Sequence, residues 1–464
     1  MKEINGRIEA WVAECEKEFT EVLARIVKIR SVREEPEEGA PYGPGPKAVL
    51  NEALAICREY GFETKSYSDR MGMAELKPGA ESELDILCHL DIVHEGTGWD
   101  SDPFTLIEKD GELYGRGVAD NKGAFVMSLF ALRLIRDLGL PIKGNARLIF
   151  GTDEECGSSD LPYFYNVEKA AARTFTPDIG FPVYNVEKGR LTSTIKKTFT
   201  NEAFAEDITE LYVGNTQNQV PELGEAKINF SLSAEQREKL AALAAERNLV
   251  LSFEEGSIKL RGKSAHAANP SVGLNTLTGL LELITALKLK SPVAEAVKEL
   301  SLLFPYGEHD GKSVGLKISD EISGELTLCP SILRFDGKSL SLCTDARLPL
   351  AVTREDELNY IKLIESRGFE VETEFKDAHY TPTESEFVQT LLEAYEFYTG
   401  LKGEALSTGG GTYVHNIEGG VGFGPCMPSY DARIHGANER LNLNDSMTAI
   451  KIFARVLASY TLLG

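Results

Sequence analysis

The sequence predicts an α/β protein in which a second, α+β domain is inserted into the first. Its 464 residues exceed what one core of ordinary size accommodates. The apolar run at 146–150 is typical of a buried strand. Between residues 187 and 382, runs that alternate apolar and polar side chains are typical of antiparallel strands with one open face.

The expected elements of the first domain begin with an amphipathic helix, whose apolar residues recur at helical spacing between Ile8 and Ile26. A loop rich in Pro, Gly and Glu follows at 34–46. The expected helices lie at 1–30, 47–60, 124–138 and 445–460, and the expected strands at 63–67, 73–76, 84–88 and 146–150. We expect these helices to pack against a mixed central sheet.

The middle of the chain shows a weak internal repeat. A strand, a helix at 234–247 and another strand follow one another between residues 226 and 253, and the same order returns between residues 339 and 375. We therefore expect two α+β units of similar, ferredoxin-like plan. The predicted domains are 1–186 together with 383–464, and the inserted segment 187–382.

Composition excludes several classes of protein. The formal net charge of −23 argues against a nucleic-acid partner and against binding to an anionic membrane surface. No stretch approaches the roughly 18 apolar residues of a membrane span, and the N-terminus lacks the apolar core of a secretory signal. The seven cysteines are scattered and fit neither a disulfide framework nor a cysteine-type zinc site. We expect a cytoplasmic protein.

An acidic segment, Gly151–Gly157, follows the strand expected at 146–150. Its three consecutive carboxylates at 153–155 repel one another, so they must be solvated, protonated or neutralised by a cation. Taken alone, such a triplet is most simply interpreted as a solvated turn. Similar clusters of His, Asp and Glu before and after it favour a two-metal hydrolase site.

A second cluster, His89-Leu90-Asp91, follows the strand expected at 84–88. Positions i and i+2 of a strand share a face, so His89 and Asp91 are expected to point the same way. This geometry suits a metal-bound imidazole whose other nitrogen donates to a carboxylate. The alternative is a histidine that makes a structural hydrogen bond at the strand end.

Further candidates lie farther along the chain. Asp120 precedes the long apolar helix, where it can cap the helix or bridge two metal ions with its two oxygens. Asp178 lies near an expected strand end, and His435 precedes the C-terminal helix. The glycine-rich run Gly409-Gly410-Gly411 offers backbone amides to a carboxylate, and it lacks the Lys-Ser/Thr ending of a P-loop.

In this order the motifs resemble a known family. The matching segments are His89-x-Asp91, Gly115-Arg116-Gly117-x-x-Asp120-x-Lys122-Gly123, Glu154-Glu155, Asp178 and His435-x-x-Asn438-Glu439. They are similar to those of the dinuclear zinc exopeptidases and deacylases, which include carboxypeptidase G2, acetylornithine deacetylase and succinyl-diaminopimelate desuccinylase. The resemblance spans nearly the whole chain, and the length and the enlarged insert look most like the dipeptidase V branch.

The resemblance implies a zinc-exopeptidase-like catalytic domain, an inserted lid and two Zn²⁺ ions per chain, for which Mn²⁺ or Co²⁺ can substitute. The implied ligands are His89 and Asp178 for one ion, Glu155 and His435 for the other, and Asp120 for both. Asp91 would orient His89, and Glu154 would be the general base. The sequence alone does not decide which of the two neighbouring glutamates is base and which is ligand.

The insert also carries residues that the resemblance connects with the substrate. His266 would stabilise the oxyanion, and Asn218 and Arg347 would bind the substrate, Arg347 at a free C-terminal carboxylate. Without the resemblance, a loop or capping histidine and a surface ion pair are the simpler interpretations. In dimeric relatives the His and Asn come from the neighbouring subunit, whereas dipeptidase V-like chains supply them from their own doubled insert. We therefore expect a monomer, with a homodimer as the alternative.

The predicted function is that of a zinc metallopeptidase which hydrolyses unblocked dipeptides by a metal-bridging hydroxide. An N-acyl amino acid deacylase or desuccinylase with the same metal site is the alternative, and no residue of the sequence decides between them. A non-catalytic metal-dependent binding protein would be expected to lack the base or a ligand. Because Glu154 and all five ligand positions are present, the enzyme is favoured.

Overall fold

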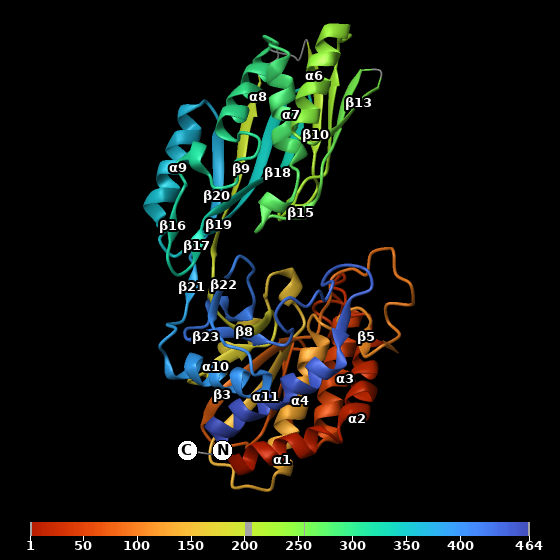
Figure 1. The fold of residues 1–464 in the computed structure, drawn as a ribbon, viewed down its shortest axis with the longest axis vertical. Helices are drawn as coiled ribbons and strands as arrows, with labels where there is room; N and C mark the ends of the chain where they lie inside the picture. Colours follow the sequence, from red (N-terminus) through yellow and green to blue (C-terminus); the bar gives the residue numbers. More distant parts are fainter. Residues whose placement is uncertain (1, 200–206, 255, 463–464) are drawn as a thin grey trace. The chain divides into compact units, whose positions relative to one another are not determined.

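The computed structural model describes residues 2–199, 207–254 and 256–462 (Figure 1). The chain divides into two compact units. Unit 1 comprises Met1–Val186, Tyr380–Leu406 and Gly411–Gly464, and unit 2 comprises Glu187–His379 and Ser407–Gly410. Part of the glycine-rich run falls in unit 2, and the domain bounds expected from the sequence stay a prediction.

Unit 1 is built on a nine-stranded mixed sheet. The strand order is β1-β2-β6-β3-β7-β23-β8-β21, and β22 pairs with β8. The strands are β1 Glu63–Tyr67, β2 Met71–Glu75, β3 Ser82–His89, β6 Asn145–Gly151, β7 Thr174–Thr176, β8 Gly180–Glu187, β21 His379–Tyr380, β22 Ala405–Thr408 and β23 Gly420–Gly424. Because β3, β6, β7 and β23 run parallel, their carboxyl ends lie at one edge of the sheet.

Both faces of this sheet are covered. On one face α4 (Lys122–Asp137) and α11 (Leu443–Thr461) pack side by side (Figure 1), and Ile86 and Leu148 belong to the same core as these helices. The alternate residues Leu87 and Ile149 belong to a second core, which contains residues of α5 (Leu161–Tyr165). Burial on both faces explains the continuous apolar runs Ile86-Leu87-Cys88 in β3 and Leu148-Ile149-Phe150 in β6.

Unit 1 also contains further helices and a second, smaller sheet. The other helices are α1 Lys2–Val12, α2 Glu16–Val27, α3 Pro44–Glu59 and α10 Glu386–Thr399, of which α3 packs on β1 and β2. A small antiparallel sheet consists of β4 Ile107–Lys109, β5 Glu112–Tyr114 and β24 Arg440–Asn442. Helix α3 begins earlier than expected, with prolines in its first turn, where a missing N–H costs nothing.

The single helix expected over 1–30 is wrong, because the chain forms α1 and α2 instead. At the break, Glu14 and Cys15 donate to carbonyls three residues back rather than four. The apolar period does not reveal the break, since it continues unchanged on both sides. The helices differ in their partners: α1 contacts α11, whereas α2 contacts α3 and α4. Residue 1 lies outside the described residues.

Unit 2 is built on an eight-stranded antiparallel sheet in the order β13-β14-β12-β10-β18-β19-β9-β20. The strands are β9 Gly189–Thr198, β10 Ile208–Val213, β12 Leu223–Ile228, β13 Val250–Glu254, β14 Ser257–Arg261, β18 Thr327–Phe335, β19 Ser339–Leu348 and β20 Glu370–Lys376. Figure 1 shows the helices on one face, namely α6 Ala234–Glu246, α7 Thr276–Ala286, α8 Pro292–Leu303 and α9 Arg354–Ser366. The expected pattern of alternating burial follows from this one-sided cover.

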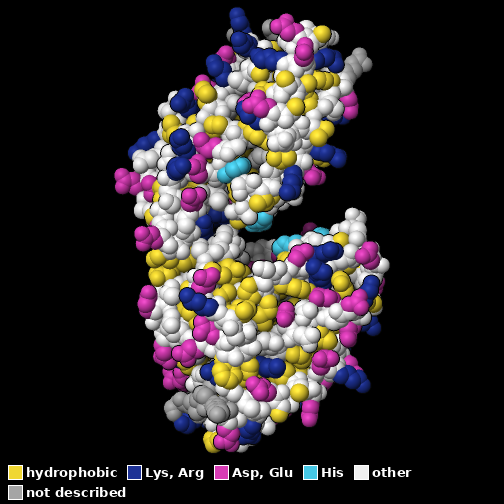
Figure 2. Space-filling view, viewed as in Figure 1, with side chains coloured by type: hydrophobic (Ala, Val, Ile, Leu, Met, Phe, Trp, Pro, Cys, Tyr) yellow, Lys and Arg dark blue, Asp and Glu magenta, His cyan; other side chains and the backbone are white. Residues whose placement is uncertain are grey.

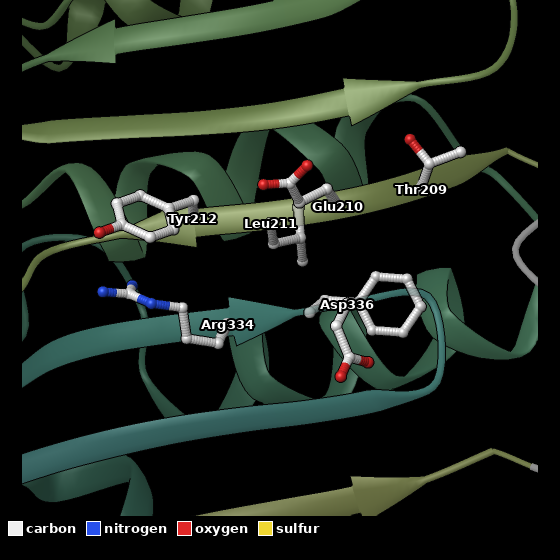
Figure 3. A pocket seen from close by; sticks show the side chains of 7 residues that line it. Thr209, Glu210, Leu211, Tyr212, Arg334 and Asp336 are labelled. Carbon is white, nitrogen blue, oxygen red and sulfur yellow. The ribbon is translucent and has the colours of Figure 1, made fainter.

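The predicted internal repeat is confirmed. The strand–helix–strand units β12–α6–β13 and β19–α9–β20 occupy equivalent positions on either side of the central β10–β18 pair. A surface pocket of about 300 Å³ lies at this seam (Figure 3). It is lined by residues 209–212 of β10, by Arg334 and Phe335 of β18, and by Asp336, which follows β18. There the Arg334 guanidinium lies 3.8 Å from the centre of the Tyr212 ring.

Two short, two-stranded sheets lie outside the main sheet of unit 2. The short sheets are β11 Gln219–Val220 with β15 Ala265–His266, and β16 Ser319–Asp320 with β17 Gly324–Glu325. Within the described ranges, no helix combines the length and the apolarity needed to cross a bilayer.

All seven cysteines are free thiols. On the face shown in Figure 2, basic side chains are interspersed with acidic ones.

Candidate metal centre

The carboxyl ends of three neighbouring parallel strands carry predicted site residues. His89 ends β3, Glu154 and Glu155 follow β6 in a 3₁₀ turn, and Asp178 follows β7. Since β3 lies between β6 and β7, with His89 paired to Gly151, these residues meet at one edge of the sheet. In α/β folds, ligands characteristically bind at this edge.

Asp120 and His435 complete the cluster from two loops. Asp120 lies in the turn before α4, and His435 lies between β23 and β24. Nε2 of His89 is 2.9 Å from Oδ1 of Asp120, and Nε2 of His435 is 3.0 Å from Oδ2 of the same carboxylate. Asp120 therefore turns one oxygen towards each imidazole, as a carboxylate shared between two cations must.

The other predicted ligands divide between the two imidazoles. Oδ1 of Asp178 lies 3.3 Å from Nε2 of His89, and Oε1 of Glu155 lies 3.2 Å from Nε2 of His435. Among the described residues, two sets have ligand atoms close enough to share one ion: His89 with Glu154 and Asp178, and His89 with Asp120 and Glu155. The structure thus brings the five predicted ligands and the predicted base together, and it leaves Glu154 within reach of an ion as well.

Burial and mutual charge set the protonation of these groups. Burial raises the pKa of Asp178 to about 7 and, together with the charge of Asp178, raises the pKa of Glu154 well above its usual range. Hydrogen bonds to Asp120 and Glu155 raise the pKa of His435 to about 10. Although burial acts in the opposite direction, the two imidazoles hold the pKa of Asp120 below its usual range. In the absence of a cation, retained protons therefore compensate part of the negative charge of the cluster.

The donor set fits divalent cations. Two imidazoles and several carboxylates form the nitrogen and oxygen environment that Zn²⁺ accepts and in which Mn²⁺ or Co²⁺ can replace it. Four acids of the cluster are largely buried, and like charges in such a site need a compensating positive charge. Cations would supply this charge in place of the retained protons.

Asp91 supports both His89 and the acidic turn. Nδ1 of His89 lies 3.1 Å from the backbone oxygen of Asp91 and 3.4 Å from its Oδ1. The Asp91 carboxylate also accepts hydrogen bonds from the backbone N–H groups of Glu154 (3.2 Å) and Glu155 (3.0 Å). One buried carboxylate thus fixes an imidazole and the backbone of two acidic residues.

A second buried carboxylate, Asp160, which was not among the predicted site residues, holds the preceding half of the same turn. Its Oδ2 accepts hydrogen bonds from the backbone N–H groups of Thr152 (2.8 Å) and Asp153 (3.1 Å) and from the Tyr413 hydroxyl (2.6 Å). Asp160 and Asp91 therefore bind four consecutive N–H groups, at 152–155. Such a turn presents its side chains from a fixed backbone.

Glu439, which was not among the predicted site residues, holds the loop that presents Asp120. This fully buried carboxylate accepts hydrogen bonds from the N–H groups of Gly117 (3.0 Å), Ala119 (2.9 Å) and Asp120 (3.2 Å). It also forms a 2.7 Å ion pair with Arg116, which is equally buried. The backbone before Asp120 is thereby anchored to the C-terminal part of unit 1.

We expect Glu439→Gln to weaken both folding and metal binding. The neutral amide leaves Arg116 as an uncompensated buried charge, which costs about 3–5 kcal/mol of the free energy of unfolding. A loosened Asp120 loop should lower the affinity for a divalent cation about 10- to 100-fold. Denaturant unfolding and zinc titration against a competing chelator measure the two effects. Glu21→Gln, which removes an exposed ion pair with Lys17, is the control, and unchanged zinc affinity in Glu439→Gln would contradict this role.

In unit 2, the pairing of β11 with β15 brings Asn218 and His266 together. Gln219 lies opposite His266, and the Ala267 N–H donates to the Asn218 carbonyl at 2.8 Å. The backbone N–H of Ala268 donates to Nδ1 of His266 at 3.1 Å. Because this nitrogen acts as an acceptor, a neutral His266 ring carries its proton on Nε2.

Without the family resemblance, a surface ion pair was the simpler interpretation of Arg347. Only 7% of this residue is exposed, so it does not lie at the surface. Its Nε donates to Oδ1 of Asp345 at 2.7 Å, and its Nη1 donates to the carbonyl of Gly409 at 2.6 Å. A Cβ at Gly409 would lie 2.9 Å from the Cβ of Ala268, so this position needs glycine. Arg347 and Gly409 therefore belong to one packed cluster in unit 2.

The glycine-rich run is divided between the units. Gly409 and Gly410 fall in unit 2, and Gly411 falls in unit 1. The Gly410 N–H donates to the Thr408 hydroxyl at 2.9 Å, so this amide is engaged within the loop. Binding of a substrate by the three glycines stays a prediction.

The fold and the cluster define a class of protein, that of metal-dependent hydrolases with an α/β domain and an inserted α+β domain. Residues 86–459 match the sequence profile of "Peptidase family M20/M25/M40". The chain belongs to this family, in agreement with the resemblance to dinuclear zinc exopeptidases.

Two sequence relatives illustrate the match. "Putative dipeptidase YtjP" of Bacillus subtilis (strain 168) is 31% identical over 443 residues, which cover 93% of this chain and 95% of the relative. "Putative dipeptidase SH1171" of Staphylococcus haemolyticus (strain JCSC1435) is 29% identical over 466 residues, which cover 98% and 99% respectively.

Solved structures share the fold over the full length. Human carnosine dipeptidase 1 matches with a TM-score of 0.61 at 15% identity, and the di-peptidase Dug1p from Saccharomyces cerevisiae matches with a TM-score of 0.58 at 13% identity; each comparison covers 98% of both chains. At such identity the likeness shows the fold alone. The predicted fold class is therefore confirmed, and the family assignment makes the chain a metal-dependent peptidase.

Proposed function

We propose that the chain is a zinc-dependent dipeptidase that hydrolyses unblocked dipeptides in the cytoplasm. The observation that carries this proposal is the position of Asp120 between the imidazoles of His89 and His435, with Glu154 in the same cluster. Two relatives with dipeptidase names cover nearly the whole chain. The free state of all seven cysteines supports a reducing compartment.

The roles of the residues follow from their chemistry. Two Zn²⁺ ions on the five ligands would act as Lewis acids and lower the pKa of the attacking water. The Glu154 carboxylate would accept a proton from that water and deliver it to the nitrogen of the leaving amine. Asp91 and Asp160 support this transfer because they fix the backbone of the turn that carries Glu154.

His266 would donate its Nε2–H to the oxyanion that develops on the attacked carbonyl. We expect His266→Ala to lower kcat about 100- to 1,000-fold, as the loss of one oxyanion donor does in other hydrolases. Zinc content should stay unchanged, because His266 is not among the proposed ligands. Steady-state kinetics and metal analysis measure both, with the exposed His94 replaced by Ala as the control. A loss of zinc that parallels the loss of activity would argue against this role.

A substrate panel tests the proposed activity. Unblocked dipeptides and the N-acetyl and N-succinyl derivatives of the same C-terminal amino acid are compared by kcat/KM on the zinc-loaded protein. A dipeptidase cleaves the dipeptides fastest. Faster cleavage of the acylated amino acids would instead identify a deacylase or desuccinylase, and no cleavage of either class by a protein with two bound ions would indicate a binding protein.

We further propose that the active form is a monomer. Asn218 and His266 lie together in unit 2, whose sheet already contains two equivalent halves in one chain. A second subunit is therefore not needed to supply these residues. Size-exclusion chromatography with light scattering should give the mass of one 50.9 kDa chain, and a stable mass of twice that value would contradict the proposal.

A further inference from the structure

Two arginines of unit 2 share one buried carboxylate. Arg190 of β9 and Arg347 of β19 lie directly opposite each other in the antiparallel register. Oδ2 of Asp345 accepts hydrogen bonds from Nε (2.9 Å) and Nη2 (2.5 Å) of Arg190 and from Nη2 of Arg347 (3.2 Å). Oδ1 of Asp345 accepts from Nε of Arg347 at 2.7 Å, and Asp345 is fully buried.

The charges of this triad do not balance. Two guanidinium groups and one carboxylate leave a net charge of +1. Burial lowers the pKa of Arg347 despite the neighbouring Asp345, which means that the surroundings disfavour its positive charge. One additional monoanion would balance the triad, whereas a dianion would reverse its sign.

The unused donors suit a carboxylate. A guanidinium has five N–H groups, and Arg347 uses three of them on Asp345 and on the Gly409 carbonyl. One N–H remains on each terminal nitrogen, which is the number that a bidentate carboxylate takes. Arg190 makes no hydrogen bond through Nη1 among those found in the described residues, and 39% of its side chain is exposed.

We propose that Arg190 and Arg347 together bind the C-terminal carboxylate of the substrate, and that Asp345 orients both guanidinium groups. This inference deepens the proposed function, on which it rests, by assigning two further residues, Arg190 and Asp345, to the recognition of a free C-terminus. Peptides with a C-terminal amide lack the negative charge and are poor substrates. The competing interpretation is that Arg190 only neutralises Asp345.

The test compares Ala-Ala with its C-terminal amide in the zinc-loaded wild type and in Arg190→Gln. We expect Arg190→Gln to raise KM for Ala-Ala about 10- to 100-fold, as loss of a charged hydrogen bond does, with kcat changed by less than about threefold. Hydrolysis of the amide should stay as slow as in the wild type, so that discrimination between the two substrates shrinks. A purely structural Arg190 would change both substrates alike or neither, and that result overturns the proposal.

Further variants keep the test independent of folding defects. Arg190→Lys retains the charge without the planar fork and should restore part of the lost affinity. Asp345→Asn should raise KM for Ala-Ala selectively, since the guanidinium groups lose their common acceptor. Arg367→Gln, which removes an exposed arginine paired with Glu299 in the same unit, is the matched control and should behave as the wild type. Thermal midpoints and zinc content are measured for all variants.

The failure of this inference is distinguishable from the failure of the proposed function. If the protein cleaves N-acetylalanine rather than Ala-Ala, the same comparison is made with N-acetylalanine and its amide, because both classes of substrate carry the carboxylate. Selective loss of the free acid in Arg190→Gln would then still support the triad. Unchanged discrimination in every variant would refute it under either activity.

Discussion

Glu154→Gln is expected to lose nearly all peptide hydrolysis while the two proposed zinc ions stay bound. Glutamine keeps the size of the side chain but cannot accept a proton from water, and general base catalysis contributes about 10²- to 10⁴-fold to rates. KM should change little, because other groups bind the substrate. Steady-state kinetics on a dipeptide, with metal analysis of the same sample, measures the effect.

Glu155→Gln is the matched control for this prediction. The two glutamates are neighbours in one turn, and both donate a backbone N–H to Asp91. They differ in their side chains, since Oε1 of Glu155 faces His435 at 3.2 Å. Glu155→Gln should therefore lose about one of the two ions.

Glu154 also lies close enough to His89 and Asp178 to bind an ion with them, so the metal content of the two variants decides which glutamate is the ligand. If Glu154→Gln lost an ion and Glu155→Gln kept both, the roles of the two glutamates would be the reverse of those proposed.

The parts of the candidate site that follow strand ends were predictable from the sequence. The alternation of strand residues led to the expectation that His89 and Asp91 point the same way. His89 is the last residue of β3 and Asp91 lies just beyond the strand, yet their side chains meet at 3.4 Å. The carboxyl ends of parallel strands meet at one edge, so an acidic turn after β6 and an Asp after β7 come close to His89. Local periodicity and one rule of sheet geometry explain why these positions come together, whereas their roles as ligands were implied by the resemblance to the family.

Apart from Asp91, the residues that support the ligands were not predictable in this way. Glu439 accepts a hydrogen bond from Ala119 across 320 positions of the chain, and Tyr413 donates to Asp160 across 253. Such contacts arise from the packing of distant segments, and no spacing within the sequence indicates them. The break between α1 and α2 has the same origin, because it follows the different partners of the two helices while the apolar period continues through it.

Removal of zinc with a chelator is expected to abolish hydrolysis and to lower the thermal midpoint of unit 1. The buried acids of the cluster lose their compensating positive charge. A ligand that binds only the folded state contributes about 2.7 kcal/mol at 100 times its Kd, which corresponds to about 5–10 °C in a domain of this size. Calorimetry and activity assays before and after chelation measure both effects, and re-addition of zinc should restore them.

The stabilisation by zinc should grow as the pH rises. Without zinc, burial raises the pKa of Asp178 from 3.8 to about 7, so between these values the folded chain holds a proton that the unfolded chain has released. Stability therefore falls as the pH rises through that window. The raised pKa of His435, about 10 instead of 6.5, gives stability that is complete below pH 6.5 and is lost towards pH 10.

Zinc displaces these protons when it binds. For both groups, the difference in free energy of unfolding between the zinc-bound and the zinc-free protein therefore increases as the pH rises. The increase in thermal midpoint on adding zinc should accordingly be larger at about pH 8 than at about pH 5.5. An increase that stays constant or shrinks over this interval would mean that the zinc binds elsewhere than at the cluster of His89, Asp120, Glu155, Asp178 and His435.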